Sequence, residues 1–357
     1  MARIASVAPA LPAFAYSQAE ITDTIVPMVT SDPGKQAVMR RLHGSSMVDT
    51  RHLVMPIERY LDETTFTESN GMFIEVAADL TERALREALD IAGLVPEDID
   101  YVMFTSVTGI SAPSIDALLV ARLGLRSDVK RVPMYGLGCV AGAAGIARVN
   151  DYLVGHPNDV AVLLAVELCS LTFQRDDDSM ANLVATGLFG DGAAAVVMVG
   201  DERATRMPVT GPDVVDARSQ LYPDTEGVIG FTASETGFRV ILTAQVSEVI
   251  ERNFGEDVAA FLAAHGLGIA DVDTWVAHPG GPRVLESFQN SLGLADGALD
   301  NSWRSLAEVG NLSSVSVLHI LADELRGASP VAGAEMVLFA LGPGVSAELV
   351  LLRWPAA

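Results

Sequence analysis

Apolar runs and amphipathic segments alternate along the chain. The runs "GLFGDGAAAVVMVG", from Gly187, and "ALGPGVSAELVLL", from Ala340, each predict a buried strand that begins after a Gly-rich turn. The segments "ADLTERALREALD", from Ala78, and "EDVAAFLAA", from Glu256, have the spacing of amphipathic helices. At the N-terminus, "MARIASVAPALPAFAYS" predicts a first strand and a turn, because two prolines interrupt the apolar stretch that a signal peptide needs. The alternation predicts an α/β fold.

The pattern of helix, turn and strand occurs twice. "IAGLVPEDIDYVMFTS", from Ile91, and "AHGLGIADVDTWVAHP", from Ala264, match at one offset of 173 residues. The matched pairs are Gly93 with Gly266, Leu94 with Leu267, Asp98 with Asp271, and Asp100 with Asp273. A repeat of this length is too long for a solenoid unit and indicates a duplicated α/β half. We therefore predict two pseudo-equivalent halves, residues 1–208 and 209–357, with the active site between them.

One of the two cysteines lies in "PMYGLGCVAGAAG". The apolar run "RVPMYGLG" predicts a buried strand before Cys139, and "VAGAAGIARVNDYLVGH" predicts a helix after it. Cys139 then lies at a strand-to-helix turn, where the free N–H groups of the first helical turn lower the pKa of a thiol. Its small neighbours let other backbone approach and offer no metal ligand. The alternative is a buried structural cysteine.

Two further residues are expected near Cys139. His278, in "WVAHPGGPRVLES", follows an apolar strand, and strand ends are where sites form in open α/β sheets. Moving from Cys139 by nearly the repeat offset reaches Asn311, in "EVGNLSSVSVLHIL", at a second predicted strand-to-helix turn. The two facing helix starts would bring Cys139 and Asn311 together between the halves. We interpret the other five histidines as structural or solvated.

A cysteine, a histidine and an asparagine at one point predict nucleophilic catalysis. Cys139 would accept an acyl group as a thioester, with an imidazolium partner favouring the thiolate. His278 and the Asn311 amide would donate hydrogen bonds to one carbonyl oxygen, and so stabilise the enolate formed when a malonyl thioester loses carbon dioxide. The enolate would attack the acyl-cysteine without help from a metal or redox cofactor. A Cys–His–Asn hydrolase, in which the asparagine orients the imidazole, is the alternative.

Composition narrows the class of partner. Half of the residues are hydrophobic, yet no uninterrupted apolar run is long enough to cross a bilayer. A net charge of −23 argues against nucleic acid and anionic membrane surfaces. An anionic substrate then needs a local basic patch, for which Arg40 and Arg41 are the best cluster, with a solvated helix face as the alternative. Two cysteines are too few for a disulfide framework and indicate a reducing, cytoplasmic location.

Five motifs occur in the order found in one enzyme family. "GLGCVAGAAG", "GLFGDGAAA", "HPGGP", "GNLSS" and "GPG" resemble the signatures of type III polyketide synthases of the chalcone synthase superfamily, over essentially the whole chain. The resemblance implies a five-layer thiolase-like fold, a homodimer, and Cys139, His278 and Asn311 as the catalytic triad. It also implies an acyl-CoA starter that is extended repeatedly with malonyl-CoA, and no cofactor. A ketoacyl synthase III that condenses once, and an inactive partner subunit of a condensing complex, are the alternatives.

The same resemblance assigns positions around the triad. Phe189 corresponds to the gatekeeping aromatic beside the cysteine, Val240 replaces a second gatekeeping aromatic, and Arg41 matches a basic position at the coenzyme A entrance. Pro343, in "GPG", belongs to a wall of the substrate site. The positions that line the elongation cavity are Val107, Ala112, Cys169, Thr172 and Ser313. Small side chains there leave room for an alkyl tail, so we expect similarity to bacterial and mycobacterial members that make alkylresorcinols or alkylpyrones.

Overall fold

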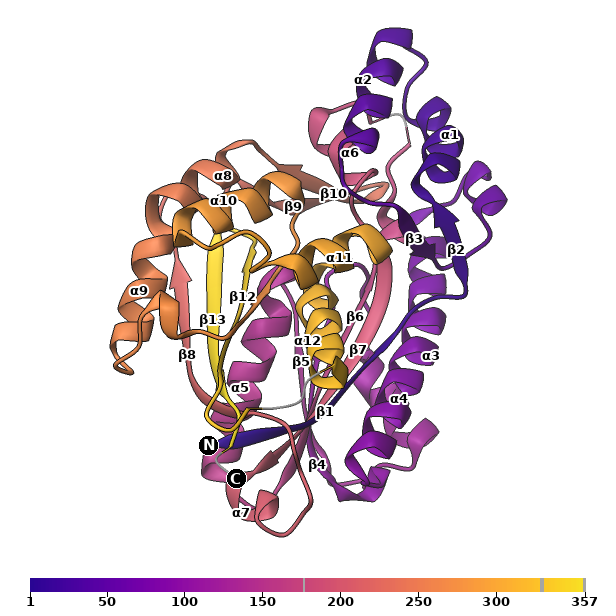
Figure 1. Cartoon of the computed structure of the whole chain (residues 1–357). Helices are drawn as coiled ribbons and strands as arrows, with labels where there is room; N and C mark the ends of the chain where they lie inside the picture. Colours follow the sequence, from indigo (N-terminus) through magenta and orange to yellow (C-terminus); the bar gives the residue numbers. More distant parts are fainter. Residues whose placement is uncertain (176, 328–330, 356–357) are drawn as a thin grey trace.

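The computed structural model describes residues 1–175, 177–327 and 331–355 (Figure 1). Within these residues, nine strands form one mixed sheet in the order β11-β12-β13-β8-β1-β7-β6-β4-β5. Their bounds are β1 (Ala2–Ala10), β4 (Ile99–Thr105), β5 (Lys130–Met134), β6 (Val160–Leu168), β7 (Asp191–Gly200), β8 (Asp213–Leu221), β11 (Thr274–Ala277), β12 (Glu335–Gly342) and β13 (Ser346–Arg353). Two separate strand pairs are β2 (Phe14–Ser17) with β3 (Thr50–Leu53), and β9 (Ile229–Ser234) with β10 (Gly237–Leu242).

Helices cover the sheet on its outer faces and also fill the space between its two halves (Figure 1). The outer pairs are α3 (Phe66–Ala92) with α4 (Ile115–Leu123), and α9 (Gly255–Ala263) with α10 (Pro282–Leu292). The central pair is α5 (Ala141–Gly155) with α12 (Ser316–Gly327). The remaining α-helices are α1 (Gln18–Val29), α2 (Pro33–Gly44), α6 (Met180–Ala185), α7 (Asp201–Ala204), α8 (Gln245–Val249) and α11 (Asp300–Val309).

Strands in both halves are buried on both faces. On β6, Leu163 packs in the same cluster as α5 and α12, whereas the next residue, Leu164, packs with α3 and α4. On β12, Leu338 faces the central pair and Phe339 faces α9 and α10. Successive side chains on a strand point to opposite faces, so each half of the sheet separates a central helix from an outer one. The predicted five-layer α/β arrangement is confirmed.

The predicted repeat is present at the level of individual hydrogen bonds. Gly93 and Gly266 both end a helix with a positive φ, 66° and 72°. Asp98 accepts a hydrogen bond from the N–H of Val95, and Asp271 accepts one from Gly268 at the same spacing. The repeat continues two residues later, because the carboxylates of Asp100 and Asp273 each accept an N–H at the start of a neighbouring parallel strand, from Val160 and Glu335. The two halves are therefore built by the same local contacts.

One sequence prediction about a strand needs correction. The run "RVPMYGLG" does form a strand, β5, but four of its five residues are exposed, because β5 lies at the end of the sheet and pairs only with β4. The first strand after residue 208 is β8, which joins the main sheet beside β13 and β1. The division between residues 208 and 209 stays a prediction. Among the described residues, no helix has both the length and the apolar character that a membrane span requires.

The central helix α5 approaches its neighbours more closely than a side chain would allow. A Cβ atom at Gly142 would lie 2.2 Å from the carbonyl oxygen of Ser314, and one at Gly145 would lie 2.5 Å from Leu163. The run of small residues after Cys139 thus lets the start of α5 pack directly against the chain that leads into α12. This close contact joins the N-terminal and C-terminal halves beside Cys139.

We predict that Gly142→Ala lowers the free energy of unfolding by about 2 kcal/mol or more, because the contact is with backbone that has little room to move. Gly71→Ala is the matched control, since Gly71 is also helical and has nothing within 4 Å of an added Cβ. The control should raise stability by up to about 1 kcal/mol through helix propensity. Urea unfolding of both variants measures the difference, and equal effects would contradict the close-packing argument.

Candidate active site

Cys139 lies in a short turn, η3 (Gly138–Val140), which leads directly into α5. Its side chain is half-buried, and its Sγ lies 3.6 Å from the Oγ of Ser313. The neighbouring Gly138 has a positive φ of 54°, and a Cβ there would lie 2.7 Å from the ring of Pro343. The turn is therefore enclosed by two segments of the C-terminal half, one at Ser313 and one at Pro343.

Asn311 does not lie at a strand-to-helix turn as predicted, because it follows helix α11 rather than a strand. Its backbone is nevertheless extended enough to form an isolated parallel bridge with Phe189. The Asn311 N–H donates to the carbonyl of Leu188 at 2.8 Å, and the Asn311 carbonyl accepts from Gly190 at 3.0 Å. The repeat offset therefore leads to a position whose local structure differs between the halves.

The orientation of the Asn311 side chain is fixed by its acceptor atom. Its Oδ1 accepts a hydrogen bond from the N–H of Ser313 at 2.8 Å and another from the Oγ of Ser316 at 3.4 Å. An amide that uses its oxygen for backbone and hydroxyl donors presents its NH2 group on the other side. Asn311 is therefore arranged as a hydrogen-bond donor.

His278 directly follows β11, as predicted, and only 2% of it is exposed. Its N–H donates to the carbonyl of Phe339 at 2.9 Å, which anchors its backbone to the neighbouring strand β12. Among the residues that the structure describes, the ring atom Nδ1 has no hydrogen-bond partner. Burial lowers the pKa of His278 to about 3, so the imidazole is neutral at physiological pH.

Shared neighbours connect the three predicted catalytic residues. Ser313 contacts both Cys139, through its hydroxyl, and Asn311, through its N–H. Leu188 accepts a hydrogen bond from Asn311, and its side chain lies within van der Waals reach of Gly281, three residues after His278. The chain places the three residues on different elements, and these contacts bring the elements together between the two halves.

A buried carboxylate that the sequence analysis did not select lies beside Cys139. Glu167, at the end of β6, is fully buried and accepts hydrogen bonds from the hydroxyl of Ser314 at 2.7 Å and the N–H of Val107 at 3.1 Å. Its other donors include Thr108, at 3.0 Å, and Ser313, at 3.4 Å. Burial raises the pKa of Glu167. The available sequence signal was a single acid that interrupts an apolar strand.

The electrostatic environment of Cys139 is opposite to the one predicted. Burial raises the pKa of the thiol to about 12, and the negative charge of Glu167 acts in the same direction, while the hydrogen bond with Ser313 opposes it. The prediction rested on the start of the helix and on an imidazolium partner, both of which favour the thiolate. In the free protein, removal from water outweighs that effect, so both Cys139 and His278 are uncharged.

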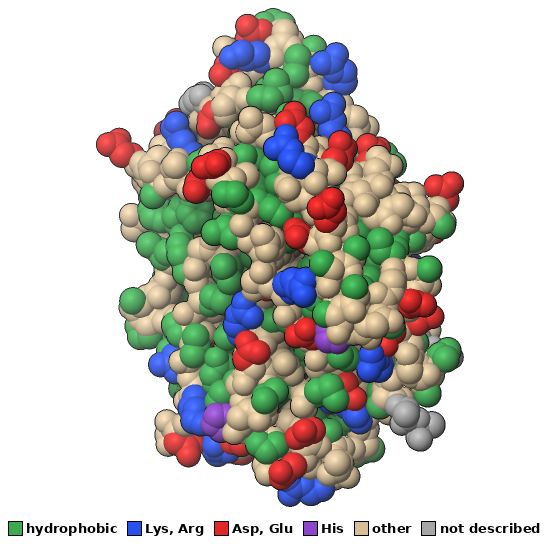
Figure 2. All heavy atoms as spheres, turned by 90° about the vertical axis from the view of Figure 1, so that its left-hand side faces the viewer, with side chains coloured by type: hydrophobic (Ala, Val, Ile, Leu, Met, Phe, Trp, Pro, Cys, Tyr) green, Lys and Arg blue, Asp and Glu red, His purple; other side chains and the backbone are tan. Residues whose placement is uncertain are grey.

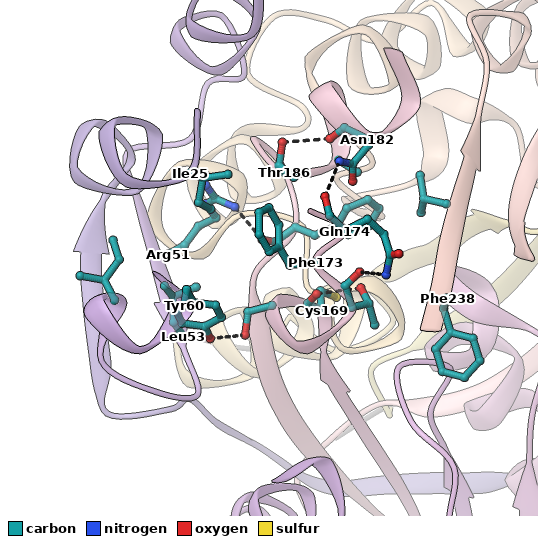
Figure 3. A pocket seen from close by; sticks show the side chains of 16 residues that line it. Ile25, Arg51, Leu53, Tyr60, Cys169, Phe173, Gln174, Asn182, Thr186 and Phe238 are labelled. Atoms are coloured by element: carbon teal, nitrogen blue, oxygen red, sulfur yellow. Dashed lines mark hydrogen bonds between the residues drawn. The ribbon is translucent and has the colours of Figure 1, made fainter. Parts of the chain in front are cut away.

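Four of the predicted substrate-binding residues line one pocket (Figure 3). They are Cys169, Thr172, Phe189 and Val240. The pocket has a volume of about 670 Å³ when its open mouth is included. Cys169 belongs to the turn η4 (Cys169–Thr172), whereas Val240 lies on β10. Residues assigned by resemblance from distant segments thus share one cavity.

The other assigned positions lie elsewhere. Val107 and Ser313 are buried around Glu167, and Pro343 packs against the Cys139 turn. Ala112 is exposed on the loop between β4 and α4, and is not part of the described pocket lining. Arg41 is exposed in the last turn of α2.

The sequence analysis missed the other side of the pocket. Its walls there come from α1, β3 and the turn η1 (Ile57–Leu61), and the residues are Ile25, Arg51, Leu53, Ile57 and Tyr60. These residues form no recognisable motif, because they are scattered over several short elements that only the fold assembles. Arg51 is the charged member of this wall and is only 3% exposed.

Comparisons with known proteins agree with this geometry. The family model described as chalcone and stilbene synthases, N-terminal domain, matches residues 1–202, and the corresponding C-terminal domain matches residues 213–355. A 1,3,6,8-tetrahydroxynaphthalene synthase of Streptomyces peucetius subsp. caesius is 52% identical over 98% of this chain and 93% of its own length. An alpha-pyrone synthesis polyketide synthase-like protein, Pks18, of Mycobacterium tuberculosis is 29% identical over 98% of the chain and 91% of its own length.

A solved structure shares the fold over its full length. The crystal structure of 1,3,6,8-tetrahydroxynaphthalene synthase from Streptomyces coelicolor A3(2), a bacterial type III polyketide synthase, superposes with a TM-score of 0.93. The alignment covers 99% of this chain and 100% of that chain at 31% identity. The predicted thiolase-like architecture is therefore confirmed.

The buried neutral histidines predict a loss of stability in mild acid. His278, with its pKa lowered to about 3, and His43, with its pKa lowered to about 4, bind protons less readily in the folded chain than in the unfolded one. Stability therefore falls as the pH drops below 6.5, and His278 alone should account for about 2 kcal/mol between pH 7 and pH 5.

Urea unfolding at pH 7 and pH 5 measures this effect. His278→Gln removes one titrating group, so the difference between the two pH values should shrink by about 2 kcal/mol relative to the parent protein. His43→Gln should change the difference in the same direction. An unaltered pH dependence in both variants would show that these imidazoles are not held neutral by burial.

Proposed function

Because this chain belongs to the chalcone and stilbene synthase family and is a type III polyketide synthase, a condensing acyltransferase, we propose that it loads a malonyl-derived starter on Cys139 and extends it with malonyl-CoA. The extended chain then cyclises to a hydroxylated aromatic product. The observation that carries this proposal is the contact of Cys139 and Asn311 through Ser313, on a chain that is 52% identical to a tetrahydroxynaphthalene synthase. No resident metal or redox cofactor takes part.

The uncharged state of the site suggests how Cys139 is activated. As the sulfur attacks the acyl thioester, its proton moves to the neutral imidazole of His278, and from there to the departing coenzyme A thiolate. The imidazole is neutral again once the acyl-cysteine has formed. It can then donate a hydrogen bond without carrying a positive charge into the next step.

His278 and Asn311 act next on the malonyl group. With its Oδ1 occupied by Ser313 and Ser316, the Asn311 amide has its NH2 group available for the thioester oxygen. Donors that are already in place stabilise the enolate as carbon dioxide leaves. The enolate carbon attacks the acyl-cysteine carbonyl and releases the Cys139 thiolate, which accepts the lengthened chain for another round. This donor role for Asn311 favours condensation over the hydrolase alternative.

The starter and product are proposed from the naphthalene-producing relatives. A tetrahydroxynaphthalene with oxygens on alternate carbons has the pattern that linked two-carbon units leave after cyclisation. A chain built from malonyl units alone has this pattern and needs no alkyl starter. Alkylresorcinol or alkylpyrone formation from a long acyl-CoA starter is the second candidate. It is favoured by the small side chain of Cys169 in the pocket and by the similarity to Pks18.

Coenzyme A entry is proposed at α2. Lys35 pairs with Asp178, and Arg40 pairs with Asp23, so two of the three cations in this region are engaged by carboxylates. Arg41 has no ion pair among the residues described and is exposed beside them. On the face that Figure 2 presents, basic and acidic side chains are interspersed, and the chain as a whole carries a net charge of −23. A phosphate group of coenzyme A therefore needs a local cation such as Arg41 to attract it.

A homodimer is proposed through the exposed edge of the sheet. Val132, on β5, and Tyr135, immediately after it, are 41% and 51% exposed. β5 also carries Lys130, Arg131 and Pro133, so its edge is mixed in character, and it pairs on one side only, with β4. The unpaired side of such an edge strand can pair with a second copy of the chain. This edge leads directly into the Cys139 turn, so dimer formation would support the position of the nucleophile. The cytoplasmic location stays a prediction.

Single changes in the triad test the proposed roles. Cys139→Ala should abolish acyl loading, because no other residue is proposed to accept the acyl group. Asn311→Ala should slow malonyl decarboxylation about 10²–10³-fold with a smaller effect on loading, because one enolate donor is lost. Intact-protein mass spectrometry measures loading, and labelled carbon dioxide release measures decarboxylation. Equal losses in both steps for Asn311→Ala would instead support a role in orienting the imidazole.

A ladder of starters tests the product class. The purified protein should convert malonyl-CoA alone to an aromatic product, and mass spectrometry should show several extensions. A preference for long acyl-CoA starters would favour the alkylresorcinol or alkylpyrone candidate. In that case Cys169→Phe should shift the preference toward shorter chains, because it fills the pocket. A single condensation would support a ketoacyl synthase III reaction, and acyl-CoA hydrolysis without malonyl consumption would support a hydrolase.

A further inference from the structure

Arg51 is a buried cation whose hydrogen-bonding capacity is only partly used. It lies on β3, and its Nε donates to the Oε1 of Gln18 at 3.1 Å. Its Nη1 donates to the carbonyl of Phe189 at 2.9 Å. Among the residues that the structure describes, the third nitrogen, Nη2, has no partner. A guanidinium carries five N–H donors, so this arrangement leaves one end of the fork free.

Among the residues that the structure describes, no carboxylate forms an ion pair with this side chain, although the charge of Asp191 acts to raise the pKa of Arg51. The nearby Asp191 is fully buried, but its oxygens accept hydrogen bonds from Ser170 and from the N–H of Val54. Burial lowers the pKa of Arg51 to about 10, which still leaves it charged at neutral pH. A buried charge with unused donors is costly unless another oxygen reaches it.

The free end of Arg51 belongs to the substrate pocket. Arg51 lines the same cavity as Cys169 and Phe189 (Figure 3). In this view the Arg51 side chain extends from beside Ile25 toward Phe173, into the space that the lining residues surround. The lining includes the apolar side chains Ile25 and Leu53 and also polar residues such as Gln174, Asn182 and Thr186. The side chains of these polar residues donate to carbonyl groups of the protein, whereas Nη2 of Arg51 is a charged donor without a described partner that an oxygen in the cavity could use.

Hydrogen bonds connect Arg51 to the backbone of Asn311 through the segment around Phe189. Arg51 holds the carbonyl of Phe189, and the residues on either side of Phe189 exchange hydrogen bonds with the backbone of Asn311. A group bound at Nη2 would thus lie in the pocket next to the segment that positions the enolate donor. Cys139 does not line this pocket itself, but Ser313 connects it to Asn311, so the proposal requires the acyl group on Cys139 to reach the pocket past this segment.

We propose that Nη2 of Arg51 binds the carboxylate at the free end of a malonyl starter and so selects that starter over neutral acyl groups. The inference rests on the proposed malonyl-primed function and adds the residue that recognises the starter. A hydrogen bond between a guanidinium N–H and a carboxylate is charge-assisted, and is stronger than one to a neutral acceptor. A neutral alkyl starter would leave Nη2 unpaired in the pocket, and this unfavourable contact gives discrimination against it.

Single-turnover loading of Cys139 tests the proposal. The parent protein and variants are mixed with malonyl-CoA or octanoyl-CoA, and the acylated fraction is followed by intact-protein mass spectrometry, counting the malonyl adduct and its decarboxylated form together. In Arg51→Met, malonyl loading should slow about tenfold or more while octanoyl loading stays within about threefold of the parent rate. Arg51→Lys keeps the charge but loses the fork, and should give an intermediate preference.

Gln18→Met is the matched control for the structural role of Arg51. Gln18 donates to the carbonyl of Gly187 and accepts from Arg51, so its loss disturbs the same loop but leaves Nη2 in place. This control should affect both starters equally. The proposal is overturned if Gln18→Met reproduces the selective loss, or if Arg51→Met slows both starters alike, which would indicate a purely structural role.

Acetyl-CoA has no free carboxylate, so it tests whether Nη2 binds the carboxylate of the starter or another oxygen of the growing chain. Loading of acetyl-CoA should be insensitive to Arg51→Met if the carboxylate is the ligand. If loading of malonyl-CoA is unaffected and only later extensions slow, Nη2 binds a chain oxygen and the proposal fails while the proposed function stands. If the parent protein does not load malonyl-CoA at all, the proposed starter is wrong and this inference falls with it.

Discussion

The active site depends on one close contact, in which the start of α5 packs against the chain that enters α12. Gly142 permits this contact, since an added Cβ would lie 2.2 Å from the Ser314 carbonyl. The two central helices are enclosed by both halves of the sheet, so neither can move away without opening the core. Cys139 and Ser313 are held 3.6 Å apart, Sγ to Oγ, as a consequence. The interface between the duplicated halves is thus also the place where the nucleophile meets its partners.

Removal from water is the second constraint on the site. It raises the pKa of Cys139 and of Glu167 and lowers the pKa of His278, so burial shifts each of these groups toward its uncharged form. A neutral imidazole can accept a proton during attack and later donate a hydrogen bond to an enolate. The same low-polarity surroundings strengthen every hydrogen bond to a developing oxyanion. An enzyme that handles enolates benefits from such a site, because bulk water would otherwise quench them.

The pocket is assembled from two groups of segments. One side comes from segments near the catalytic residues, such as η4 and the strand carrying Val240, and the other from β3 and η1. Arg51 belongs to this second side and also holds the carbonyl of Phe189. Arg51 therefore connects the proposed starter site with the segment that carries Phe189 and is bonded to the backbone of Asn311. A change in the wall can alter the starter while the triad and the condensation chemistry stay the same.

The sequence by itself determined the duplicated α/β architecture and selected the three residues that are predicted to form the catalytic site. Hydrophobic periodicity is a local property, and Asp98 and Asp271 make the same short-range hydrogen bonds in both halves, so the repeat could be found from spacing alone. Only the tertiary structure decided the exposed edge of β5, the helical approach to Asn311, the direction of the Cys139 pKa shift, and the presence of Glu167 and Arg51 at the site. Each of these depends on which distant segments exclude water from a residue or pair with it, and no local pattern records that.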